Sequence, residues 1–235
     1  MKDLAKKIIF VLIFFALVLI GKNINFSAVV GADSQFFTLF QFFGPIAGGF
    51  LGSFFGIIAV FFAQLADLLI VGKEFQLLTL LRFLPMLLAV YYFGSKKKSL
   101  KLIVPLLCII LFVLNPVGRQ AWFYSMFWLI PILAVILPKK VPGKLFFRSF
   151  GATFTAHAVG SVIWLYSVPM TAQQWISLIP ITAYERFLFG IGIAVSFVVL
   201  NTVLDFVVEK LKLSQKVLFV DKRYTLSKLL KFKSA

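Results

Sequence analysis

The chain alternates long apolar segments with short polar or charged ones. A helix needs about 20 apolar residues to cross ~30 Å of hydrocarbon, and most of these segments approach that length. The pattern therefore predicts an all-α, polytopic helical membrane protein. The apolar segments are Ile8–Ile20, Gln35–Val71, Phe75–Phe93, Leu100–Leu114, Gln120–Pro138, Phe150–Ser167 and Phe187–Val208.

The second apolar segment is too long for a single crossing. Its 37 residues would form a helix of ~55 Å at about 1.5 Å per residue. Gly44-Pro45 interrupts the segment, and proline ends or kinks helices. We therefore expect a short helix, about Gln35–Phe43, followed by a full one, about Ile46–Val71, which brings the total to about eight transmembrane helices.

Basic residues fall mainly on one side of the membrane in this arrangement. Cytoplasmic loops carry an excess of Lys and Arg, and a cytoplasmic N-terminus puts 19 of the 24 basic residues on that side. The partition predicts a multi-pass cell-membrane protein with both termini cytoplasmic. The outer side keeps Lys22, Lys73, Arg82, Arg119 and Arg186; the inner side holds Lys2, Lys6, Lys7, Lys96, Lys97, Lys98, Lys101, Lys139, Lys140, Lys144, Arg148 and eight residues between positions 210 and 233.

Both ends of the chain are basic. Three lysines precede Ile8–Ile20, as in a signal peptide, but no small-x-small cleavage site follows, so we expect a retained first helix. Asn201, Asp205 and Glu209 step by four along the last helix and are expected to meet the basic tail. That tail either lies on anionic lipid or is solvated. We expect a helical transmembrane domain over residues 1–208 and a basic cytoplasmic tail over residues 209–235.

Composition excludes the other protein classes. Hydrophobic residues make up 61% of the chain, against roughly 45–50% in an ordinary globular domain, and 30 residues are Phe. Disorder, a disulfide scaffold and a coiled coil are excluded by the same numbers. In a soluble protein, the net charge of +16 would indicate a nucleic acid as the binding partner. In this chain we expect the lipid bilayer as the partner, and we expect no binding of nucleic acid. Cys108, the single cysteine, is interpreted as a buried thiol.

Motifs for catalysis are absent from the sequence. There is no His-Glu-x-x-His, no Walker loop and no Gly-x-Ser-x-Gly. His157 is the only histidine, and the acids within apolar segments are Asp67 and Asp205, near opposite faces of the membrane. We therefore expect no enzyme, no cofactor and no metal site.

Polar side chains gather instead on the outer side of the predicted topology. The loop from Gln173 to Arg186, the outer ends of the third and seventh helices, and the start of the fourth contribute most of them. Ionisable groups within a membrane usually face an interior cavity or a partner. We expect an outward-open pocket with aromatic walls for a small, flat or amphipathic molecule. The candidate binding residues are Gln64, Asp67, Arg82, Arg119, His157, Trp164, Trp175, Glu185 and Arg186.

Each of these residues also has a structural interpretation. Asp67 with Arg82, or Glu74 with Arg119, would form an ion pair that only stabilises the fold. His157 would be a hydrogen-bonded packing residue. The tryptophans match the aromatic belt that membrane proteins place at the interface.

Small residues recur near the start of the third helix. Gly48, Gly52 and Gly56 are spaced by four, a pattern that lets another helix approach closely. Gly44 and Pro45 precede them at the predicted helix break. We expect these five residues to serve helix packing.

The segment Asn25–Asp67 resembles the substrate-binding S components of energy-coupling factor (ECF) vitamin transporters. Those proteins show a short second helix, a Phe-Gly-Pro-(hydrophobic)-Ala-Gly turn and a Gly-spaced third helix. The turn is matched by Phe43-Gly44-Pro45-Ile46-Ala47-Gly48, and Gly52 and Gly56 follow it. S components usually have six helices and an Ala-xxx-Ala pattern in the first, whereas Ile8–Ile20 contains only Ala16.

The resemblance implies membrane transport: capture of a vitamin-like micronutrient from outside, with a separate membrane coupling subunit and its ATPases driving release. Two other functions stay open. A membrane sensory or scaffold domain would use the basic tail to engage a cytoplasmic partner. An intramembrane enzyme is the third alternative.

Overall fold

The computed structural model describes residues 2–28, 36–72, 74–138, 141–210 and 220–231. Six of the basic residues used in the charge partition lie outside this part of the chain: Lys73, Lys139, Lys140, Lys212, Lys216 and Lys233. The elements in chain order are α1 (Lys2–Lys22), β1 (Asn25–Ala28), β2 (Phe36–Thr38), α2 (Phe40–Phe43), α3 (Ala47–Val71), α4 (Leu77–Leu81), α5 (Leu84–Gly94), α6 (Ser99–Leu114), α7 (Pro116–Gln120), the 3₁₀ helix η1 (Trp122–Trp128), α8 (Leu129–Ile136), α9 (Lys144–Ser167), α10 (Ala172–Lys210), the 3₁₀ helix η2 (Lys222–Tyr224) and α11 (Leu226–Lys231).

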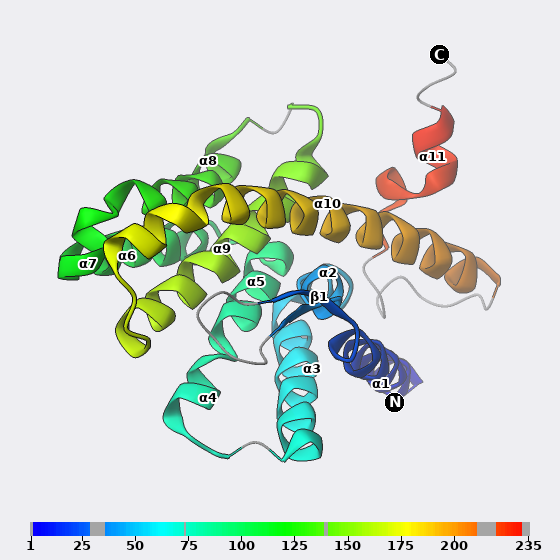
Figure 1. Cartoon of the computed structure of the whole chain (residues 1–235). Helices are drawn as coiled ribbons and strands as arrows, with labels where there is room; N and C mark the ends of the chain where they lie inside the picture. Colours follow the sequence, from blue (N-terminus) through cyan, green and yellow to red (C-terminus); the bar gives the residue numbers. More distant parts are fainter. Residues whose placement is uncertain (1, 29–35, 73, 139–140, 211–219, 232–235) are drawn as a thin grey trace.

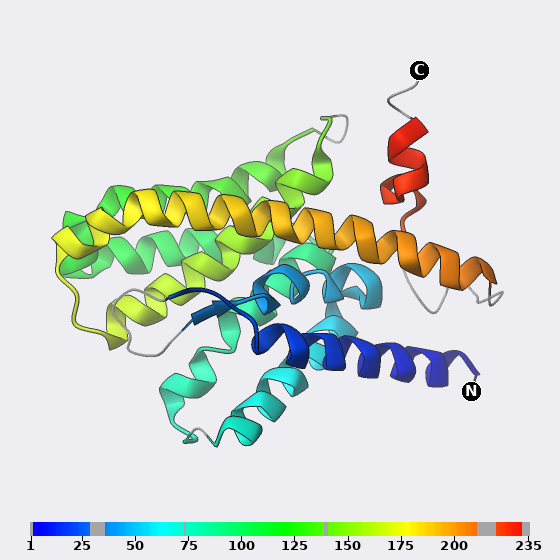
Figure 2. The same ribbon diagram turned by 45° about the vertical axis from the view of Figure 1, so that its right-hand side comes forward.

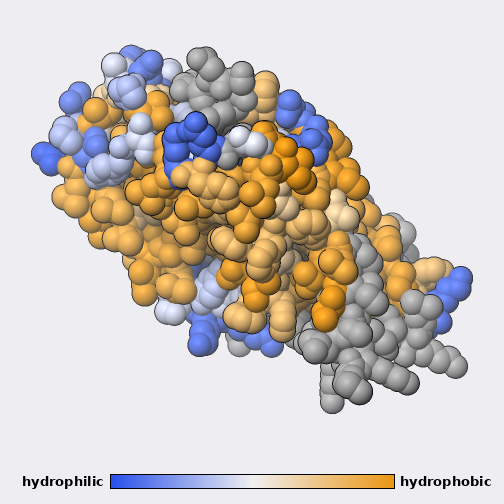
Figure 3. All heavy atoms as spheres, turned by 90° about the horizontal axis from the view of Figure 1, so that it is seen from below, coloured by the Kyte–Doolittle hydropathy of each residue, from blue (hydrophilic) through white to orange (hydrophobic). Residues whose placement is uncertain are grey.

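The predominantly helical class predicted from sequence is confirmed. Three helical stretches in the described ranges are long and apolar enough to span a membrane: Ala47–Val71, Leu77–Gly94 and Ala172–Lys210. Two shorter apolar stretches, Ser99–Leu114 and Trp122–Ile136, accompany them. Large hydrophobic side chains such as Phe54 and Ile70 remain exposed, and Figure 3 shows a face covered mostly by such residues. This surface is what a helical membrane protein presents to lipid.

The helices pack in a chain of neighbours. Helix α1 packs on α3, α3 on α5, α5 on α9, and α9 on α10, α8 and α6 (Figure 1). Stacked and edge-on rings of Phe50, Phe93 and Phe197, each nearly inaccessible, join α3, α5 and α10. Cys108 on α6 is buried as a free thiol, as predicted.

The last residues of α1 and α3 meet at the same end of the bundle. The ammonium of Lys22 lies 2.5 Å from a carboxylate oxygen of Asp67. Because both helices end there, the chain between them must return to the opposite end. Strands β1 and β2 pair beside the end of α1, where the Leu39 N–H donates to the Ile24 carbonyl, so the return is made after Thr38, by α2 and the residues that follow it.

The predicted nine-residue helix Gln35–Phe43 is wrong. Phe36–Thr38 forms strand β2, which pairs antiparallel with β1, and only Phe40–Phe43 is helical, as a single turn. Aromatic and β-branched residues favour a strand once a partner strand is available, and Asn25–Ala28 supplies that partner. The β1–β2 pair is visible in blue at the centre of Figure 1.

Helix α3 is interrupted at one of the predicted packing glycines. Gly52 has φ 77° and ψ 162°, a conformation open almost only to glycine. Gly48 still permits a close approach: an added Cβ would lie 2.2 Å from the carbonyl oxygen of Val90 on α5. A Cβ on Gly56 would instead meet the backbone of Ala47, within α3 itself, at 2.8 Å. The three glycines therefore do not form one straight row along α3.

The predicted outer loop Gln173–Arg186 is also wrong. Ala172–Lys210 is a single helix of 39 residues, visible along its whole length in Figure 2. Pro180 lies inside it; membrane helices tolerate an internal proline where neighbouring groups satisfy the freed backbone carbonyl. At about 1.5 Å per residue this helix is ~58 Å long. Its first half packs against the polar groups described below.

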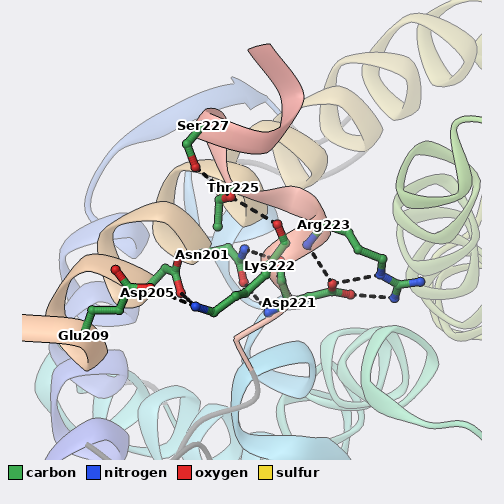
Figure 4. A network of polar contacts seen from close by, with 8 residues as sticks. All are labelled: Asn201, Asp205, Glu209, Asp221, Lys222, Arg223, Thr225 and Ser227. Carbon is green, nitrogen blue, oxygen red and sulfur yellow. Dashed lines mark hydrogen bonds and ion pairs between the residues drawn. The ribbon is translucent and has the colours of Figure 1, made fainter. Parts of the chain in front are cut away.

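The described part of the tail docks on the C-terminal half of α10 (Figure 4). The Asn201 side chain donates to the carbonyl of Asp221 at 2.7 Å and accepts from the Asp221 backbone N–H at 2.9 Å. Lys222 lies 2.8 Å from Glu209 and 3.8 Å from Asp205. The expected meeting of these three α10 residues with the basic tail is confirmed. Hydrogen bonds from the Arg223 guanidinium hold the pKa of the Asp221 carboxyl below its usual value.

Candidate ligand-binding site

A cavity of about 240 Å³ opens between α9, α10 and η1 near the end of the bundle where α1 and α3 terminate. The start of α5 and the segment β2–α2 close its other sides. It is smaller than the roughly 300–1,000 Å³ of a drug-sized site. The lining residues are Phe37, Gln41, Arg82, Pro85, Tyr124, Ala156, His157, Gly160, Ser161, Ile163, Trp164, Trp175, Leu178, Ile181, Thr182, Glu185 and Arg186.

Six of the nine binding residues predicted from sequence lie in this wall. They come from the C-cap of α4, the second half of α9 and the first half of α10, and these elements meet only in the folded chain. Their assembly in one cavity is a structural finding, whereas ligand binding by them remains a prediction. The six are Arg82, His157, Trp164, Trp175, Glu185 and Arg186.

The other three predicted residues lie elsewhere. The Gln64 side chain donates to the carbonyl oxygen of Phe83 at 3.4 Å. Asp67 forms its ion pair with Lys22, so the predicted pairing of Asp67 with Arg82 is wrong. Arg119 is exposed and donates to a backbone carbonyl on α6.

The alternative ion pair of Glu74 with Arg119 is not formed either. Glu74 accepts a hydrogen bond from the Gln76 amide at 2.6 Å. These two pairings depend on which helices are neighbours, and the spacing of residues along the chain does not give that information.

Aromatic rings form much of the cavity wall. The Arg82 guanidinium lies over the Trp164 ring, 5.3 Å from its centroid, within the range of a cation–π contact. Trp175 is 1% exposed and packs edge-on against Tyr124 at 5.1 Å between centroids. Such rings provide flat apolar surfaces against which another ring can stack.

Arg186 is held in place by two phenylalanines and one acid. Its guanidinium lies 4.5 Å from the ring centroid of Phe37 and 4.6 Å from that of Phe189. One of its terminal nitrogens is 3.4 Å from a carboxylate oxygen of Glu185, the preceding residue. The side chain of Arg186 is 4% exposed and that of Glu185 12%. The pair is therefore removed from solvent on the cavity wall.

Four N–H donors in the cavity wall have no hydrogen-bond partner among the described residues. They are Nε of Arg82, Nε of Arg186, Nε1 of Trp164 and Nε1 of Trp175, and all four atoms are buried. Buried polar groups in proteins are nearly always hydrogen-bonded, and leaving one unpaired is unfavourable by about 1–3 kcal/mol. Four such donors belong to side chains that line one cavity, which makes this cavity the candidate site for a ligand that supplies acceptor atoms.

A directed chain of hydrogen bonds runs behind the cavity. Trp128 donates to Nδ1 of His157 at 3.1 Å, so that nitrogen carries no proton and Nε2 does. Nε2 then donates to the Tyr124 hydroxyl at 2.9 Å, and the hydroxyls of Tyr124 and Thr182 share a hydrogen bond of 3.0 Å. Both ring nitrogens of His157 thus have protein partners. His157 orients Tyr124, in agreement with its interpretation as a hydrogen-bonded packing residue.

Sequence reasoning missed Tyr124, Thr182 and Phe37 as cavity residues. Thr182 precedes Arg186 by four positions, so a helical reading of this segment would have placed the two on one face. Tyr124 lies in an apolar run that gave no polar signal. Phe37 reaches the cavity only because β2 pairs with β1.

The residues that the structure describes contain no group of three or more His, Cys, Asp or Glu side chains that could hold a metal ion.

Comparisons with known proteins leave the family open. No protein-family model matches the chain, and no solved structure matches it. The chain is similar to the uncharacterized protein MJ0923 of Methanocaldococcus jannaschii, with 28% identity over 200 residues, covering 75% of this chain and 66% of that protein. The alignment thus spans just under two thirds of the relative's own length. The chain is a helical protein with membrane-spanning features and an archaeal relative of unassigned role.

Proposed function

We propose that the protein captures a small acidic, ring-bearing molecule in the cavity between α9 and α10, as a membrane-embedded binding protein. The observation that carries this proposal is the set of four buried N–H donors without partners around one aromatic cavity. Two of the donors belong to arginines, which favour carboxylate or phosphate groups. The Trp164 ring, which is partly exposed, provides the stacking surface for the ring of the ligand.

The proposal includes eight membrane crossings with both termini cytoplasmic, so that the cavity opens to the outside. Seven crossings are helical, and the second is the short return through α2 and the residues that follow it. The ion pair of Lys22 with Asp67 supports this count, because it requires such a return between α1 and α3. The excess of Lys and Arg on the tail side supports the orientation.

Two substitutions test the binding site. Arg82→Ala removes a cation and a donor, and Trp164→Ala removes the ring beneath that cation. Both should abolish thermal stabilisation of the purified protein by a ring-bearing acid that stabilises the wild type. Arg119→Ala is the matched control, because Arg119 is exposed and outside the cavity wall. Full stabilisation of both cavity variants would contradict the proposal.

Transport in the manner of an ECF S component is the role we propose for this binding. Energy would then come from a separate membrane subunit with ATPases. Affinity purification from the native membrane should recover such an ATPase pair, and cells carrying both should accumulate the bound acid. Binding without any accumulation would instead favour the sensory alternative.

A further inference from the structure

Charged groups in the cavity wall do not balance. The described lining residues include two cations, Arg82 and Arg186, and one anion, Glu185. The wall therefore carries one excess positive charge. A lone charge in a membrane interior is strongly unfavourable and normally has a partner.

Glu185 neutralises one arginine and not the other. It lies 3.4 Å from Arg186, which is itself fixed between two phenylalanine rings. Arg82 comes from a different element, the C-cap of α4, and lies over Trp164. Within the described ranges, no ion pair involves Arg82. The excess charge is thus located at Arg82.

We propose that Glu185 determines the charge of the ligand, so that the cavity selects ring-bearing acids with a single negative charge. This inference rests on the proposed function. A monoanion balances Arg82 and leaves the Glu185–Arg186 pair intact. A dianion brings a second negative charge close to the Glu185 carboxylate, where like charges repel strongly because little water screens them. An uncharged analogue leaves Arg82 without a counter-charge.

Three probes of one shape and different charge test this selection: benzoate with one negative charge, phthalate with two, and benzamide with none. Apparent Kd values come from the concentration dependence of the thermal unfolding midpoint in detergent micelles, at constant ionic strength. The wild type should bind benzoate at least about tenfold more tightly than either of the other two probes. A tenfold difference in Kd needs only about 1.4 kcal/mol, and two close charges shielded from water interact by more than that.

Two variants move the charge balance in opposite directions. Glu185→Gln keeps the shape of the side chain and raises the excess to two positive charges, so phthalate should become the preferred probe. Arg82→Gln removes the excess positive charge, so the affinity for benzamide should rise relative to the affinity for benzoate. Glu74→Gln is the matched control: Glu74 is exposed and outside the cavity wall, and its substitution should leave the wild-type order unchanged.

The outcomes separate this inference from the proposed function. Equal binding of benzoate and phthalate by the wild type, or an unchanged order in Glu185→Gln, overturns charge selection and leaves the binding function standing. If Glu185→Gln does not fold, Arg82→Gln decides by the same criterion. If no probe binds the wild type or either variant, the proposed function fails and this inference fails with it.

Discussion

Gly48→Ala perturbs the closest contact between two helices, α3 and α5. A Cβ at this position would lie 2.2 Å from the carbonyl oxygen of Val90 and 3.0 Å from the backbone nitrogen of Gly94. Carbon–oxygen contacts between helices normally lie at about 3.3–3.6 Å. Both obstructing atoms belong to the backbone and cannot rotate away. Helix α5 must therefore move by about 1 Å to restore an ordinary C···O distance.

The expected destabilisation is a balance of two effects. Alanine in a helix interior is favoured over glycine by about 0.5–1 kcal/mol, whereas overpacking a close contact destabilises by about 1–3 kcal/mol. The difference between these two ranges is a net loss of about 0–2.5 kcal/mol, with its centre near 1 kcal/mol. For a chain of this size, each kcal/mol lost lowers the unfolding midpoint by about 2–4 °C.

Tryptophan fluorescence on heating the micelle-solubilised protein measures this midpoint. Gly160→Ala is the matched control, since its Cβ would meet only Pro85, at an ordinary 3.7 Å. It should unfold at the wild-type temperature or slightly above it, because it gains helix propensity without a clash. A Gly48→Ala midpoint equal to or above that of Gly160→Ala would refute the steric argument.

Further predictions concern backbone strain, the tail and topology. Gly52→Ala should destabilise by about 1–3 kcal/mol, measured by the same unfolding midpoint, because φ is 77° there. Asn201→Ala should expose the tail to faster trypsin cleavage, because both hydrogen bonds to Asp221 are lost. The lowered pKa of Asp221 means that its ionised form stabilises the docked tail at pH values above the unfolded pKa of about 3.9. This stabilisation is lost as pH falls through the folded value. The protection of the tail amides, taken relative to their intrinsic exchange rate at each pH, should therefore fall below about pH 4 and stay constant between pH 5 and 8. A membrane-impermeant thiol reagent added outside should label Asn25→Cys and spare Ser99→Cys, and labelling of the latter would overturn the topology.

Local patterns in the sequence were sufficient for the helix-rich membrane class and for six of the residues that line the cavity. Apolar length alone identifies helices such as α3, since its residues need no distant partner to form the helix. His157 and Trp164 fall on one stretch of α9, and Glu185 and Arg186 are adjacent. The sequence therefore predicted correctly that all four residues lie near the same end of the bundle, where the cavity is.

Features that depend on distant segments could not be read from the sequence. Strand β2 exists only because β1 pairs with it. Lys22 and Asp67 are 45 positions apart, and their ion pair follows from the packing of α1 on α3. The polar residues in the first half of α10 predicted a loop, yet Glu185 and Arg186 form an ion pair within the helix.

Because α10 is uninterrupted, it connects the cavity rigidly to the place where the C-terminal segment docks. Glu185 at the cavity and Asn201 at the tail are sixteen positions apart, which is ~24 Å of helix, and no proline lies between them. A pivot of about 10° at the cavity would carry the far end through about 4 Å at that radius. A ligand that tilts the helix axis slightly at the cavity would therefore cause a larger displacement of α10 at the face where the C-terminal segment docks.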